Sequence, residues 1–197
     1  MSDVLTATMP KAEPVGPGRL VLVVGPSGAG KDSVIAGAKS LCANEQTIIF
    51  PRRIVTRPAT AGEDHLSVSN SGFDDALRCD AFALWWQAHD LKYALPISID
   101  ADIRCGRTVV CNASRGIVDG ARARYRHVVC ALITASPDLL IARLEGRSRN
   151  SDGSFKHRIE RNAMFADFSA DVVIDNSGAL EEAVNALTFL LRDSGAR

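Results

Sequence analysis

Short apolar runs alternate with helical segments over most of the 197-residue chain. The runs at 20–24, 107–111, 127–133 and 172–174 are rich in branched apolar side chains and have the length of buried strands. Helices are predicted at 33–41, at 179–192 and after Ser136, which with Pro137 forms a typical helix start. The alternation predicts an α/β fold, with a mostly parallel sheet flanked by helices.

The middle of the chain follows a less regular pattern. A strand at 47–50 is expected to run into a basic loop at 52–58, and a turn is expected at 61–65. A short helix at 73–79 and a strand at 82–86 follow. In parallel sheets ligands bind at the carboxyl ends of the strands, where 25–32, 112–115 and Asn176 should meet.

Residues 25–32 read Gly-Pro-Ser-Gly-Ala-Gly-Lys-Asp and lie between the first strand and the first helix. This is the G-x-x-x-x-G-K pattern of a phosphate-binding loop in its proper strand–loop–helix context. Glycines let successive N–H groups point at phosphate oxygens, and Lys31 can reach the β- and γ-phosphates. The alternative is an ordinary glycine-rich turn, which the position of Lys31 disfavours.

Asp32 stands where this loop has a serine or threonine hydroxyl that binds Mg²⁺. A carboxylate is also a hard oxygen ligand and could hold Mg²⁺ directly or through water. Ser33 could supply the hydroxyl instead, or Asp32 could only stabilise the helix dipole.

Composition narrows the class of protein. Hydrophobic residues make up 46% of the chain, which is enough for a core, so 19–197 is predicted to be one domain after a flexible leader at 1–18. The formal net charge of +0 argues against broad adhesion to nucleic acid or membrane. Five dispersed cysteines predict buried free thiols, and with no apolar signal segment they indicate the cytoplasm.

Two clusters of basic residues are candidates for binding phosphate. Arg52, Arg53 and Arg57 follow a strand, and arginine forks match phosphate oxygens. The second cluster could form a flap over transferring phosphates, and consists of Arg143, Arg147, Arg149, Lys156, Arg158 and Arg161. Taken alone, each cluster could also be a solvated surface.

Three separated motifs together resemble the guanylate kinase superfamily of P-loop proteins over about residues 19–192. They are the loop at 25–31, the Val-Thr-Arg-Pro turn at 55–58 with Ala-Gly-Glu at 61–63, and the segment 143–147 followed by Arg158. The resemblance implies an acceptor-binding region at about 50–97, in which Arg57 and Tyr93 contact the acceptor phosphate. It also implies an arginine lid at about 146–162 that contains Arg147 and Arg158.

The sequence departs from guanylate kinases in the acceptor region. Leu84 stands where they have an acidic residue that reads guanine, and a leucine cannot accept hydrogen bonds. Thr60 replaces an acceptor-phosphate arginine, and the turn after Glu63 is shorter. Acidic residues after the strand at 109–111 are replaced by Asn-Ala-Ser-Arg, so the acceptor pocket loses negative charge and gains Arg115.

These departures resemble the ribose 1,5-bisphosphate phosphokinases of phosphonate catabolism. The shared features are Gly-Lys-Asp-Ser at 30–33, Glu-Asp-His at 63–65, Trp-x-Ala-His at 86–89 and Asn-x-Ser-Arg at 112–115. The resemblance implies transfer of the γ-phosphoryl group of ATP to the 1-phosphate of ribose 1,5-bisphosphate, with Mg²⁺, to give 5-phosphoribosyl 1-diphosphate. A phosphate acceptor is already ionised and needs no general base, so the enzyme's task is to align and neutralise charge.

The expected site follows from this resemblance. The catalytic residues are Lys31, Arg147 and Arg158. The ATP-binding residues are Gly25, Pro26, Ser27, Gly28, Ala29, Gly30, Lys31, Asp32, Ser33 and Asn176, the last near the adenine. The acceptor-binding residues are Arg53, Arg57, Asp64, Tyr93, Asn112, Ser114 and Arg115, with Asp64 on the ribose hydroxyls.

Two alternatives stay open at the level of sequence. One is a guanylate or other nucleoside monophosphate kinase, which Leu84 disfavours. The other is a guanylate-kinase-like interaction module without catalysis, which Lys31, Arg147 and Arg158 disfavour. The partner expected on the first interpretation is a small phosphorylated sugar, and a homodimer is compatible with the sequence.

Overall fold

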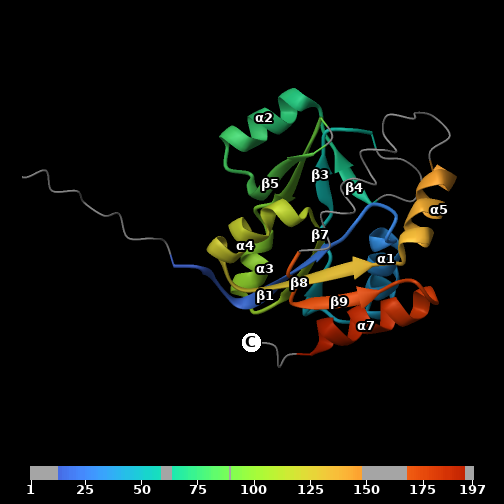
Figure 1. Ribbon diagram of the computed structural model, residues 1–197. Helices are drawn as coiled ribbons and strands as arrows, with labels where there is room; N and C mark the ends of the chain where they lie inside the picture. The colour runs from blue at the N-terminus through green and yellow to red at the C-terminus, as the bar shows by residue number, and fades with distance from the viewer. Residues whose placement is uncertain (1–12, 59–63, 89, 148–167, 194–197) are drawn as a thin grey trace, which may run out of the picture.

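The protein was analysed as a computed structural model, which describes residues 13–58, 64–88, 90–147 and 168–193 (Figure 1). Its main sheet has five parallel strands in the order β2-β7-β1-β8-β9. These strands are β1 (Val15–Val24), β2 (Ile48–Ile49), β7 (Thr108–Asn112), β8 (Tyr125–Thr134) and β9 (Val172–Asp175). The predicted parallel sheet is therefore confirmed.

The central strand β1 shows how the sequence builds two hydrophobic layers. Val21 and Val23 point into one cluster, while Leu20, Leu22 and Val24 point into the other, and all five are fully buried. This alternation follows from the two-residue period of a strand. Because both faces are apolar, both faces must be covered.

Helices cover the two faces (Figure 1). The Val21 face is covered by α1 (Lys31–Leu41), α5 (Pro137–Arg147) and α7 (Leu180–Arg192). The Leu22 face is covered by α3 (Ile99–Arg104), the short 3₁₀ helix η1 (Arg115–Ile117) and α4 (Val118–Arg124).

A second sheet of four strands, in the order β4-β3-β6-β5, packs against the Leu22 face through Ala83 and Leu95. Its strands are β3 (Arg53–Val55), β4 (His65–Ser67), β5 (Phe82–Ala88) and β6 (Leu91–Pro96). Strands β3 and β4 are parallel, whereas β6 is antiparallel to both β3 and β5. The helix α2 (Asn70–Arg78) precedes β5, and its N-cap Ser69 accepts a hydrogen bond from Gly72 N at 3.0 Å.

Two expectations need correction. Residues 15–18 belong to β1, and Val15 pairs with Tyr125 of β8, so the expected leader at 1–18 ends before Val15. Residues 53–55 form β3 rather than a basic loop, because their backbone pairs with both β4 and β6.

Candidate active site

The loop at 25–30 connects β1 to α1 and has a backbone that only glycine tolerates at its two ends. Gly25 has φ 152°, and a Cβ there would lie 2.1 Å from the carbonyl oxygen of Ile133. Gly30 has φ 84°, and a Cβ there would lie 2.5 Å from Asn176 Nδ2. Any side chain at either position would therefore displace its neighbour, which explains the glycines of the motif.

Lys31 is the first residue of α1, and its ammonium group folds back over the loop. Lys31 Nζ donates to the carbonyl oxygens of Gly25 at 2.8 Å and Pro26 at 2.9 Å. The positive charge therefore lies over the loop at the N-terminus of a helix, where the helix dipole also favours an anion. The exposed Ser33 follows in the same turn.

Two residues from distant segments support the loop from behind. Asn176, which follows β9 and is 3% exposed, donates from Nδ2 to the carbonyl oxygen of Ala29 at 2.8 Å. Arg143 of α5 donates to the carbonyl oxygens of Gly28 at 3.4 Å and Asn176 at 3.1 Å. The Asn176 side chain was expected near an adenine, but it is buried and bonded to the loop. In the sequence, Arg143 belongs to a basic cluster and to the segment 143–147 of the guanylate kinase resemblance, but neither feature predicted its contact with the loop.

Asp32 is positioned by residues from two other strands. Its Oδ1 accepts a hydrogen bond of 2.7 Å from Asn112 Nδ2, at the end of β7, and lies 3.7 Å from Arg53 Nη2, at the start of β3. The Asp32 side chain is 60% exposed, whereas that of Arg53 is 23% exposed. The three residues join the phosphate loop to the acceptor sheet.

A pocket of about 110 Å³ opens beside this group. Its polar lining includes Asp32, Arg53, Asn112 and Asp64, and the rest is apolar, with Ile35, Ala36, Pro51 and Val110. Asp64 forms ion pairs with Lys39 at 2.8 Å and Arg52 at 3.9 Å. Three expected acceptor residues are therefore brought together with the loop, and Asp64 reaches the pocket already paired with cations.

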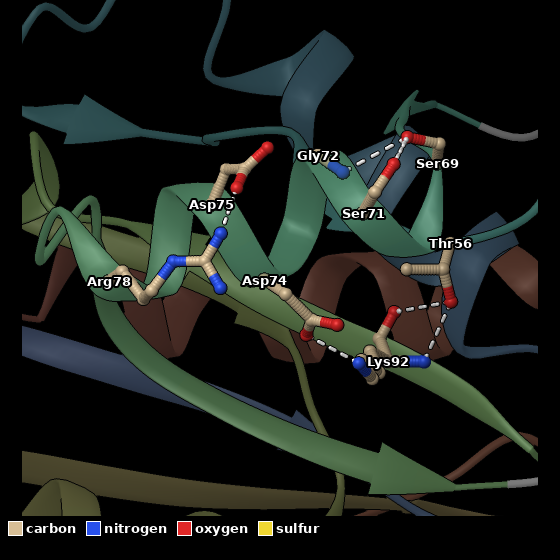
Figure 2. A network of polar contacts seen from close by, with 8 residues as sticks. All are labelled: Thr56, Ser69, Ser71, Gly72, Asp74, Asp75, Arg78 and Lys92. Carbon is tan, nitrogen blue, oxygen red and sulfur yellow. Dashed lines mark hydrogen bonds and ion pairs between the residues drawn. The ribbon is translucent and has the colours of Figure 1, made fainter.

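The next part of the expected acceptor site lies at the other end of β3 (Figure 2). Thr56 extends the pairing of β3 with β6, because its N–H donates to Lys92 O at 3.0 Å and its Oγ1 accepts from Lys92 N at 2.9 Å. Lys92 is in turn paired with Asp74 of α2 at 2.5 Å. This network fixes the backbone immediately before Arg57 and immediately before Tyr93.

Arg57 and Tyr93 are both half-buried. The carbonyl oxygen of Arg57 lies 3.3 Å from Nε2 of the buried His65. The Tyr93 ring stacks on Trp86 of β5, with ring centroids 5.4 Å apart and planes 8° from parallel. Neither side chain lines the pocket beside Asp32, so Arg57 and Tyr93 lie apart from Arg53, Asp64 and Asn112.

The Asn-Ala-Ser-Arg run continues from β7 into η1. Ser114 is the N-cap of η1, and its hydroxyl accepts a hydrogen bond from Gly116 N at 3.4 Å. Arg115 is the first residue of η1 and is half-buried. The expected lid falls mostly outside the described residues: α5 ends at Arg147, whose side chain is not described, and Arg158 lies in the undescribed segment.

One cysteine lies directly beside the site and is buried. Cys111, adjacent to Asn112, is 1% exposed, and burial raises the pKa of its thiol to about 12. All five cysteines are free, and Cys79 and Cys105 are exposed rather than buried as expected. Over the described residues, no three His, Cys, Asp or Glu side chains group as a metal site, and no helix has the length and apolarity to cross a membrane.

Comparison with known proteins identifies the family. No protein-family model matches the chain. The ribose 1,5-bisphosphate phosphokinase PhnN of Bradyrhizobium diazoefficiens is 43% identical over 197 residues, which cover 100% of both chains. The corresponding protein of Rhodopseudomonas palustris is 48% identical over 178 residues, or 90% of each chain. The chain belongs to the ribose 1,5-bisphosphate phosphokinase family.

Among solved structures, the guanylate kinase from Anaplasma phagocytophilum matches with a TM-score of 0.67. The match covers 92% of this chain and 88% of that chain at 17% identity, so it shows the fold alone. The predicted guanylate kinase-like α/β fold is thus confirmed.

Proposed function

We propose that this protein is an ATP-dependent kinase that phosphorylates ribose 1,5-bisphosphate on its 1-phosphate. An oxygen of the 1-phosphate forms a bond to the γ-phosphorus of ATP, the bond from that phosphorus to the β-phosphate oxygen breaks, and ADP leaves. The other product is 5-phosphoribosyl 1-diphosphate. The observation that carries the proposal is the identity of 43% to a ribose 1,5-bisphosphate phosphokinase over the whole chain.

The loop at 25–30 and Lys31 are proposed to bind the ATP phosphates. Lys31 Nζ is directed over the loop by the carbonyl oxygens of Gly25 and Pro26, and it can exchange these partners for phosphate oxygens. Asn176 and Arg143 hold the loop carbonyls that point away from the phosphates. A loop prepared in this way binds phosphate without reorganising, which favours the transition state.

The residues near Asp32 fit a Mg²⁺ ion that accompanies ATP. Mg²⁺ is bound in such sites by one or two carboxylates together with phosphates and water. Asp32 supplies an exposed carboxylate at the start of α1, and the Ser33 hydroxyl is exposed beside it. Asp32 would hold the ion, which neutralises charge on the β- and γ-phosphates when bound.

Arginines on the acceptor side are proposed to hold the two phosphates of the sugar. Arg53 lies at the end of β3 next to Asp32, while Arg57 lies beyond the other end. Arg115 starts η1, and Arg147 is the last residue of α5, followed by the segment containing Arg158. Cations spread around the site suit an acceptor that carries two phosphates, because phosphoryl transfer depends on positioning and charge neutralisation.

The second candidate is a nucleoside monophosphate kinase, suggested by the fold of the Anaplasma phagocytophilum guanylate kinase. Leu84 counts against it, because this residue is packed against the core and offers no hydrogen bond to a base. Five free cysteines support a reducing compartment such as the cytoplasm.

The test is an acceptor comparison with purified protein, Mg²⁺ and ATP. With ribose 1,5-bisphosphate, we expect formation of ADP and of a diphosphate product visible by phosphorus NMR, at least about 10⁴-fold more efficiently than with GMP. The Lys31→Ala variant serves as the control for contaminating kinases. Comparable turnover of GMP would overturn the proposal in favour of the second candidate.

A further inference from the structure

One carboxylate oxygen connects the nucleotide loop to the acceptor sheet. Asp32 Oδ1 accepts from Asn112 Nδ2 at 2.7 Å and lies 3.7 Å from Arg53 Nη2. Within the part of the chain that the structure describes, Asp32 Oδ2 has no partner, and the side chain is 60% exposed. The carboxylate is thus held by one oxygen and offers the other to solvent.

Asp32 and Arg53 come from different functional halves of the molecule. Asp32 is the second residue of α1 and follows Lys31 directly, whereas Arg53 opens β3 of the acceptor sheet. The Arg53 side chain is 23% exposed and lines the pocket, so a ligand there has access to its guanidinium group. Any charge that binds Asp32 therefore changes the environment of Arg53.

We propose that Asp32 couples the two substrate sites by holding Arg53 until Mg²⁺ and the nucleotide engage its carboxylate. This inference rests on the proposed function. A carboxylate that is neutralised by a cation attracts Arg53 less, and Arg53 can then turn its fork to an acceptor phosphate. Asn112 acts as a positioning residue, because its hydrogen bond holds Oδ1 on the acceptor side and leaves Oδ2 available to a cation.

The proposal explains why the loop carries a carboxylate instead of a hydroxyl. A serine could ligate Mg²⁺ but could not hold an arginine by charge. The coupling works in both directions, because linkage requires that acceptor binding strengthen metal–nucleotide binding by the same factor. For a half-exposed ion pair, a factor of about five is expected.

The experiment measures binding of ribose 1,5-bisphosphate by titration calorimetry without nucleotide, in a two-by-two set of variants. The set contains the parent protein, Asp32→Asn, Arg53→Gln and the double variant. We expect Asp32→Asn to tighten acceptor binding about fivefold when Arg53 is present and by less than about twofold when it is replaced. Removing the Asp32 charge could also tighten binding simply because a negative charge near an anionic ligand is lost. The double variant measures that general effect, because it has no Arg53 to release.

The second arm adds Mg²⁺ and a non-hydrolysable ATP analogue. Here the difference between the parent and Asp32→Asn should shrink toward zero, because the metal already occupies the carboxylate in the parent. Asp32→Ser, which restores the usual hydroxyl of the loop, should bind the acceptor as Asp32→Asn does in the absence of nucleotide. Agreement between the two variants would show that the effect comes from loss of the carboxylate and not from the asparagine. Circular dichroism and thermal unfolding check that each variant is folded.

Each outcome decides the matter. Equal tightening by Asp32→Asn with and without Arg53 would overturn the coupling and leave the proposed function intact, as would no tightening at all. If the folded parent protein bound GMP but not ribose 1,5-bisphosphate in both arms, the proposed function would fail and this inference with it.

Discussion

Asn176 and Ala29 are 147 positions apart in the chain, yet Asn176 Nδ2 donates to the Ala29 carbonyl oxygen at 2.8 Å. The bond joins the end of β9 to the phosphate loop across the sheet. Asn176 is buried, and its backbone carbonyl in turn accepts from Arg143. The shape of the loop therefore depends on residues that do not belong to the loop motif.

Replacing Asn176 should weaken both the fold and nucleotide binding. Asn176→Ala leaves the Ala29 carbonyl without its partner, so the free energy of unfolding should fall by about 1–3 kcal/mol. ATP binding should weaken about tenfold, because the loop then samples other shapes. Urea unfolding and calorimetry measure the two effects. Asn185→Ala, at an exposed position on α7, is the matched control and should change neither.

Removing the Lys31 ammonium group should strongly reduce catalysis while leaving the protein folded. Lys31→Ala removes the charge that lies over the loop, and kcat/KM should fall by about 10²–10³-fold or more. Steady-state ADP formation is the measurement. Arg78→Ala removes a cation that pairs only with Asp75 on the exposed face of α2, among the described residues, and should keep full activity (Figure 2). If Lys31→Ala turned over substrate as efficiently as the parent protein, the assignment of the loop would be contradicted.

The fold and the loop were predictable because their signals are local. The buried strands are apolar runs in the sequence. The loop is a contiguous motif, and its backbone geometry requires glycine at positions 25 and 30. Strand β3 was not predicted, because it has only three residues, too few to show the alternation of apolar and polar side chains that marks a strand. It forms only because its backbone pairs with β4 and β6.

The supporting contacts of the site were not predictable for a different reason. Arg143 and Asn176 meet the loop only after β8 and β9 have placed them beside it, and no local pattern in the sequence predicts either contact. The contact of Asp32 with Asn112 likewise spans 80 positions. Side-chain partners at such separation follow from the packed sheet and not from spacing along the chain.

The only two tyrosines offer a matched pair of tests on the acceptor site. Tyr93→Phe keeps the stack on Trp86 but removes the hydroxyl, so KM for the acceptor should rise about tenfold with little change in stability. Tyr125→Phe removes a hydroxyl that donates to Asp100 Oδ1 at 2.7 Å, far from the loop in the fold. It should lower stability by about 1–2 kcal/mol and leave KM unchanged. An unaltered KM in Tyr93→Phe would remove Tyr93 from the acceptor site.

The buried carboxylate of Asp100 should be important for stability and not for catalysis. Its side chain is 5% exposed and accepts from Arg124 Nη2 at 2.6 Å as well as from Tyr125. Asp100→Ala leaves both donors without their acceptor, which should cost about 3–5 kcal/mol of unfolding free energy. Asp102→Ala, whose partner Arg107 is 43% exposed, should cost about 1 kcal/mol or less. Urea unfolding measures the two losses of stability, and kinase assays well below the unfolding temperature measure the activity of the folded variants. Similar losses of stability in both variants would contradict the prediction.

Stability should fall in alkaline solution because buried thiols keep their protons in the folded state. Burial raises the pKa of Cys111 from its ordinary value of 9.0 to about 12 and that of Cys130 to about 11. The unfolded chain loses these protons near pH 9 while the folded chain retains them. The contribution is therefore complete below pH 9 and is lost as the pH rises toward the folded pKa, by about 1.4 kcal/mol per pH unit for each thiol.

The measurement is urea unfolding at several pH values between about 8 and 11. Cys111→Ala forms a small cavity and lowers stability at every pH, but it should also make the alkaline decline shallower by about 1.4 kcal/mol per pH unit. Cys79→Ala, at an exposed position, should leave the slope unchanged. The slope, not the absolute stability, is the decisive quantity, because a cavity cannot alter the number of protons released on unfolding. Parallel curves for the parent and Cys111→Ala would show that the Cys111 thiol does not titrate differently in the two states.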